Sequence, residues 1–164
     1  MGSVAKGFTL KQAVKKHLEN LGHEIIDVGC PNADTFYKFP SMGERVAKAL
    51  NNGAADLAIN CCGSGTGASI LANKYKGVCA VSCESVKTAV LAKIVNDANC
   101  LCMGEGVVSE ELGSKMAEAF IDAKFQDMDG VPQKILDFWK EARDEAFALG
   151  TIAQEREMET LLMD

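Results

Sequence analysis

The chain has 164 residues, 48% of them hydrophobic and 24% charged, which is the size and composition of one globular domain. Its net charge of −6, with no block of lysines and arginines, argues against a nucleic-acid partner. No apolar run approaches the roughly 20 residues that span a bilayer, and the first residues, "MGSVAKGFTLKQ", lack the apolar core of a secretory signal. We therefore expect no membrane partner.

The first predicted element is a helix, although open α/β folds normally begin with a strand. Apolar residues recur at helical spacing between Leu10 and Leu21, and Gly22 follows as a stop. The next segment, "HEIIDVG" (23–29), has the pattern of a strand. The sequence therefore predicts no strand before the first helix.

A repeating order of strands and helices fills the middle of the chain. Ser41 and Glu44 form a capping box, which predicts a helix from there through Leu50, ended by Gly53. Beyond it we expect a strand over 56–62, a helix over 66–75, a strand over 78–83, a helix over 84–95, a strand over 100–104 and a helix from 109. Strands that alternate with helices in this way form a parallel sheet with helices on both faces. We predict an α/β fold, a Rossmann-like three-layer sandwich with a parallel sheet.

An amphipathic segment follows Pro132. Apolar residues between Ile135 and Ile152 predict one or two helices without a sheet of their own. Residues 128–164 would then form a C-terminal helical extension of a domain that spans 1–127. Two interpretations remain open, a helix packed on its own domain and an arm that contacts another subunit.

The seven cysteines lie mostly in or beside apolar, strand-like runs. This placement favours buried, reduced thiols and a cytoplasmic protein. Cys79 and Cys83 have the spacing of a zinc-binding pair, but the intervening "AVS" indicates a strand. Zinc is therefore the less favoured alternative, and we predict no metal site.

A glycine-rich loop stands out in "NCCGSGTGASILANK" (60–74). Gly63, Gly65 and Gly67 let the backbone turn sharply and direct N–H groups to one point before a helix, which favours an anion. A nucleotide phosphate is one candidate, because Glu84 lies about 20 residues further on, where a ribose-binding acid is expected. The loop, however, has neither the Walker lysine nor the G-x-G-x-x-G spacing.

Cys62 directly precedes this loop, at the carboxyl end of a predicted strand, where open α/β sheets bind their ligands. A Cys–His pair is disfavoured, because His17 lies in a helix and His23 begins a strand at the remote end. Proton abstraction next to a carbonyl fits better, since a thiolate at a helix N-terminus has a lowered pKa and glycine N–H groups stabilise an enediolate. Aldose–ketose isomerisation needs this base, this anion hole and no cofactor.

The block "CCGSGTGASILANKYKGVCA" (61–80), with "NDAN" (96–99) and "CLCMGEGVVSEELG" (100–113), resembles the type B ribose-5-phosphate isomerase and galactose-6-phosphate isomerase subunit family. The resemblance covers roughly residues 2–127. It implies an isomerase of a sugar or sugar phosphate, a homodimer or homotetramer whose active sites are completed across a subunit interface. The catalytic residues it implies are Cys62, as the base, and Ser64, and the substrate-binding residues are Gly63, Gly65, Thr66, Gly67 and Asn96.

Several residues with which the family holds a phosphosugar are replaced in this chain. Val4 and Ala5 stand where the resemblance implies a sugar-binding Asp and His, and Val95 stands where it implies a ring-opening His. The other replacements are Phe39 for a Tyr, Gly106 for an Arg, and "DGVPQKIL" (129–136), with Lys134 as its only cation, for two phosphate-binding arginines.

Three interpretations follow from these departures. The chain could isomerise an open-chain or unphosphorylated sugar, which needs no ring opening. It could be a pentose-phosphate isomerase with substitute ligands. It could also be a non-catalytic subunit of a heteromeric isomerase, which the retained Cys62 disfavours.

Overall fold

The computed structural model describes residues 1–149 and forms an α/β fold around one parallel sheet of four strands, in the order β1-β2-β4-β3. The predicted Rossmann-like fold class is confirmed. The strands are β1 (Gly2–Ser3), β2 (Ala58–Cys62), β3 (Ala80–Ser82) and β4 (Cys100–Gly104). The helices are α1 (Phe8–Asn20), α2 (Phe39–Asn51), α3 (Thr66–Ala72), α4 (Val86–Asn96), α5 (Glu110–Asp122) and α6 (Gln133–Ala148), and a 3₁₀ turn spans Ala5–Gly7.

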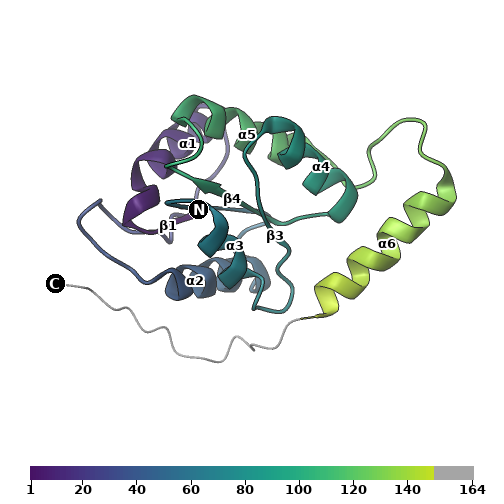
Figure 1. Ribbon diagram of the computed structural model, residues 1–164, viewed down its shortest axis with the longest axis horizontal. Helices are drawn as coiled ribbons and strands as arrows, with labels where there is room; N and C mark the ends of the chain where they lie inside the picture. Colours follow the sequence, from purple (N-terminus) through teal and green to yellow (C-terminus); the bar gives the residue numbers. More distant parts are fainter. Residues whose placement is uncertain (150–164) are drawn as a thin grey trace.

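The sheet lies between two layers of helices (Figure 1), with α1, α4 and α5 on one face and α2 and α3 on the other. Each face has its own apolar core. The first includes Leu10, Ile59 and Phe120, and the second includes Val46 and Ala72. Successive residues of a strand point to opposite faces, so β2 contributes side chains to both cores.

The first strand is present, which corrects the expectation that the fold begins with a helix. β1 is only two residues long and pairs with β2 in parallel, Gly2 opposite Asn60 and Ser3 opposite Cys61. The segment 23–29, by contrast, is not a strand. It runs beside β1, where the Val28 N–H donates to the Met1 carbonyl (2.8 Å), but a partner of two residues supports no longer ladder.

The start of α2 also differs from the predicted capping box. The helix begins at Phe39, its N-cap is Lys38, and Ser41 and Glu44 are buried within it. Proline in the first turn fixes a helical φ and needs no N–H partner there, so Pro40 starts the helix earlier than the Ser–Glu spacing indicates. The glycine stops are confirmed, since Gly22 and Gly53 both have positive φ.

Helix α6 projects beyond the layered body of the domain (Figure 1) and has no buried residue. It is held to its own domain near its C-terminal end. There Arg143 pairs with Asp97 (3.0 Å) and stacks on the Phe125 ring, and the Gly77 N–H donates to the Phe147 carbonyl. Ile152, which the predicted amphipathic segment includes, lies outside the described residues.

Among residues 1–149 there is no helix with the length and apolar character that crossing a bilayer requires. All seven cysteines are free, as expected, and six of them are buried.

Candidate active site

A cavity of about 480 Å³ opens at the carboxyl ends of β1 and β2. Its floor is formed by Cys62 and the glycine-rich loop, and its rim by two segments that lie far from this loop in the sequence. The lining residues are Val4, Ala5, Lys6, Phe36, Tyr37, Lys38, Phe39, Cys62, Gly63, Ser64, Thr66 and Gly67. The structure therefore brings Cys62, Gly63, Ser64, Thr66 and Gly67 of the predicted site together in one cavity.

The two adjacent cysteines of β2 point to opposite faces of the sheet. Cys61 is fully buried in the core beneath α1 and α5, whereas Cys62 lies on the face covered by α2 and α3 and lines the cavity. Burial raises the pKa of the Cys61 thiol well above its usual range, so Cys61 stays protonated. Of the two thiols, only Cys62 can meet a ligand.

The turn after Cys62 requires glycine at two places. Gly65 has a φ of +82°, and a Cβ there would lie 2.6 Å from the Ser82 hydroxyl oxygen. Across the turn, a Cβ at Gly104 would lie 2.4 Å from the Ser64 carbonyl carbon, so the loop rests directly on the end of β4. In this tight turn the Gly65 N–H donates to the Sγ of Cys62 at 3.0 Å. Gly65 therefore contacts the thiol without lining the cavity.

The loop offers further polar groups to the cavity. The hydroxyl oxygens of Ser64 and Thr66 are 2.7 Å apart and hydrogen-bonded, and both side chains are exposed. The backbone N–H groups of Gly63 and Ser64 donate to no acceptor within residues 1–149. These donors lie next to Cys62 and are available to a ligand.

The rim holds residues that the sequence analysis did not single out as site residues, Lys6 and the segment 36–38. The Ala5–Gly7 turn brings Lys6 beside Gly63, and the segment that precedes α2 brings Tyr37 and Lys38. The Tyr37 ring stacks against the Arg45 guanidinium, whose carbon lies 4.4 Å from the ring centroid. No pattern in the sequence marked these residues, because only the loops of separate elements bring them to Cys62.

Asn96 is not brought to this cavity. It is exposed at the C-terminal end of α4, just before β4 starts, whereas Cys62 ends β2. Because β2 and β4 are parallel, Asn96 lies at the amino ends of the strands and Cys62 lies at their carboxyl ends. Within one chain, Asn96 cannot touch a ligand that Cys62 holds.

The two histidines lie away from Cys62, and neither Cys79 nor Cys83 lines its cavity. His17 hydrogen-bonds Glu118 (2.7 Å), and His23 lines a separate cavity of about 270 Å³ at the amino ends of the strands. Within residues 1–149, no group of three or more His, Cys, Asp or Glu residues is arranged to hold a metal ion. The cavity at Cys62 therefore has one thiol, one phenol and two ammonium groups as its titratable side chains.

Comparison with known proteins identifies relatives over most of the chain. A family model described as "Ribose/Galactose Isomerase" matches residues 1–137. A 4-deoxy-4-sulfo-D-erythrose isomerase from Clostridium sp. (strain MSTE9) is 38% identical over 76% of this chain and 79% of its own. D-erythrulose-4-phosphate isomerase 2 from Mycolicibacterium smegmatis is 32% identical over 84% of this chain and 91% of its own.

The fold has solved counterparts as well. The structure of Clostridium thermocellum ribose-5-phosphate isomerase B superposes with a TM-score of 0.77 at 31% sequence identity, and the match covers 88% of this chain and 93% of that one.

Proposed function

The chain belongs to the ribose/galactose isomerase family and interconverts an aldose and a ketose, and we propose that Cys62 is the base that moves the proton. The observation that carries this proposal is the lining of the cavity. Among residues 1–149 the cavity is lined by no carboxylate and no imidazole, and Cys62 is the one cysteine that lines it. A thiolate is able to remove a proton from the carbon next to a carbonyl group.

In the proposed reaction the Cys62 thiolate takes the proton from C2 of the aldose, and the electron pair of that C–H bond forms the C1–C2 double bond. The carbonyl oxygen becomes an oxyanion, which gives an enediolate. The N–H groups of Gly63 and Ser64 and the hydroxyls of Ser64 and Thr66 are the donors we assign to it. The proton of the C2 hydroxyl then moves to O1, and return of the first proton from Cys62 to C1 forms the C2 carbonyl and yields the ketose. Gly65 holds the thiol in place, and Gly67 lines the cavity behind it.

We propose that the substrate is a sugar in its open-chain form. A cyclic sugar must open before it isomerises, and opening needs a group that moves a proton between the anomeric hydroxyl and the ring oxygen. Val4 and Ala5 line the cavity on the side of β1 and offer no such group. A four-carbon sugar substituted at C4 has no hydroxyl that closes a five-membered ring, so it stays open. The two curated relatives described above carry such compounds in their names.

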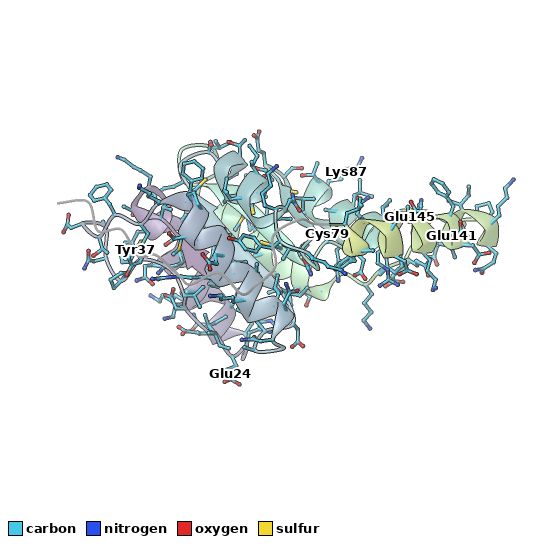
Figure 2. The ribbon with its side chains drawn as sticks, turned by 90° about the horizontal axis from the view of Figure 1, so that it is seen from below. Glu24, Tyr37, Cys79, Lys87, Glu141 and Glu145 are labelled. Atoms are coloured by element: carbon cyan, nitrogen blue, oxygen red, sulfur yellow. The ribbon has the colours of Figure 1, made fainter. Side chains whose placement is uncertain are left out.

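We further propose that the active unit is a homodimer or a larger homo-oligomer. Asn96 can serve as a substrate ligand only if a second copy presents it at the cavity. Helix α6 has no buried residue, and its Phe138 side chain is 62% exposed. In Figure 2, Glu141 and Glu145 of α6 lie at the opposite end of the molecule from Tyr37 on the cavity rim. The described part of the arm, residues 128–149, would thus reach a neighbouring subunit's cavity and not that of its own domain 1–127.

The seven free thiols support a place for the protein in the reducing cytoplasm.

The experiment is proton NMR in D₂O with the full chain and a panel of sugars. The panel pairs D-erythrose 4-phosphate with D-erythrose, and ribose 5-phosphate with ribose. We expect incorporation of deuterium at C2 together with ketose formation, first for the tetrose derivatives. If no sugar in the panel exchanges, the proposed isomerase activity fails and the interpretation as a non-catalytic subunit replaces it.

A further inference from the structure

The active-site cavity carries a positive charge that the chain as a whole does not. The net charge of the protein is −6, yet the part of the chain that the structure describes lines the cavity with two lysines, Lys6 and Lys38, and no aspartate or glutamate. Neither ammonium group pairs with a carboxylate within residues 1–149. Two unpaired cations beside a reaction site attract a ligand with negative charge.

The backbone of Lys6 is fixed beside the catalytic loop. The Gly7 N–H donates to the Val4 carbonyl (3.0 Å), which closes the turn, and a Cβ at Gly7 would lie 2.4 Å from the Cys61 carbonyl carbon. The turn is thus pressed against β2. The Cβ of Lys6 is 3.7 Å from the point where a Cβ of Gly63 would lie. The Lys6 side chain therefore starts next to the loop that follows Cys62, and its ammonium group is exposed to solvent.

Lys38 approaches from the other side of the cavity. As the N-cap of α2 it has extended backbone angles, and its carbonyl accepts the Ser41 N–H (3.0 Å). The helix start thus fixes the backbone of Lys38, and its exposed side chain meets no acid. The two described arginines are engaged elsewhere, because Arg45 stacks on Tyr37 and donates to the Val28 carbonyl, and Arg143 pairs with Asp97.

We propose that Lys6 binds a terminal oxyanion of the substrate, a phosphate or a sulfonate, with Lys38 as the second cation. This inference rests on the proposed isomerase function and deepens it, because it specifies a substrate that is both open-chain and anionic. An ammonium group is a compact charge with rotatable donors, so it can bind either tetrahedral anion. The reacting carbons then lie over Cys62 and the charged end lies between the two lysines.

The test compares Lys6→Ala and Lys38→Ala with Lys124→Ala, an exposed lysine that does not line the cavity and gives the same change in net charge. The first measurement is the affinity for inorganic phosphate and for methanesulfonate, by ³¹P NMR titration and by calorimetric titration. We expect Lys6→Ala to weaken the affinity for at least one of these anions about tenfold or more, as loss of a charge-assisted hydrogen bond does. Lys124→Ala should leave it unchanged, and Lys6→Arg should retain most of it.

The second measurement is turnover of D-erythrose 4-phosphate, its 4-deoxy-4-sulfonate analogue and uncharged 4-O-methyl-D-erythrose, which likewise cannot close a five-membered ring. We expect Lys6→Ala to raise the KM of a charged substrate about 10- to 100-fold, and to lower kcat/KM for the charged substrates at least about tenfold more than for 4-O-methyl-D-erythrose. Equal losses on charged and uncharged sugars would show a structural role, and unchanged anion affinity with an unchanged KM would also overturn the inference. If no sugar reacts but Lys6→Ala still weakens anion binding, the isomerase proposal fails and the anion site stands.

Discussion

Replacement of Cys62 by serine should abolish proton transfer and leave the fold intact. The Sγ of Cys62 accepts the Gly65 N–H at 3.0 Å, and a serine oxygen at this position retains an acceptor for that donor. A serine hydroxyl does not ionise in the range where a thiol does, so the variant keeps the loop geometry and loses the base. A positioned base contributes about 10²–10⁴-fold to the rate. We therefore expect the rate of C2 exchange to fall by that factor, which corresponds to a rise of about 3–5 kcal/mol in the activation free energy.

The matched control is Cys61→Ala, one residue earlier on the same strand. Cys61 is completely buried in the core beneath α1 and α5, so removing its sulfur should cost about 1–2 kcal/mol of stability and little activity. The assay is deuterium incorporation at C2 by proton NMR, with thermal unfolding of each variant as the check on folding. If Cys62→Ser retains exchange within tenfold of the natural chain, or if Cys61→Ala alone abolishes it, the assignment of the base is wrong.

Three other predictions concern the substrate, the ion pair behind β1 and the arm. Ribose 5-phosphate should be a poor substrate, because Val4 and Ala5 offer no acid or base for the opening of its ring, and a kcat/KM of about 10⁴ M⁻¹s⁻¹ or more would contradict this. Asp27→Asn should cost about 3 kcal/mol in urea unfolding at pH 7, because it leaves the buried Lys11 ammonium, 2.9 Å from the carboxylate, unpaired. Burial, the largest single influence, raises the pKa of Asp27, but the hydrogen bonds from Lys11 and Gly29 and the charges of Lys11 and Lys15 together outweigh it and lower the pKa. The deficit should therefore persist near pH 4 and vanish only as the pH falls through that lowered value. Deletion of residues 131–164 should reduce the number of subunits per particle, as calculated from the mass in light scattering. An unchanged number of subunits would exclude the arm from the interface.

The sequence predicted the elements whose residues carry a strong pattern. The alternating strands and helices from β2 to α5 follow from apolar runs, and in the structure Ser85 and Ser109 cap their helices through side-chain hydrogen bonds. β1 was missed because Gly2 and Ser3 have no strand pattern. They form a strand only because β2 offers them a partner.

The part of the candidate site that is continuous in the sequence was predictable. The part that separate elements bring together was not. Cys62 and its glycines are consecutive, so their chemistry is visible in the sequence. Lys6 and Lys38 are single lysines in unremarkable contexts, and they become site residues only through the Ala5–Gly7 turn and the early start of α2. The predicted role of Asn96 could not be evaluated from the sequence, because it depends on whether Asn96 lies at the amino or the carboxyl ends of the strands.

The opposite orientation of Cys61 and Cys62 limits how this protein can be altered. Loss of one residue between Ala58 and Cys61 would move Cys62 to the buried position of Cys61, beneath α1 and α5, and insertion of one residue would place Cys61 over the cavity instead of Cys62. Strand β2 is therefore intolerant of length changes, whereas the segment 36–38 and the side chain of Lys6 line the same cavity without belonging to the strand. Engineering of a new specificity should begin at those rim positions and leave the register of β2 untouched.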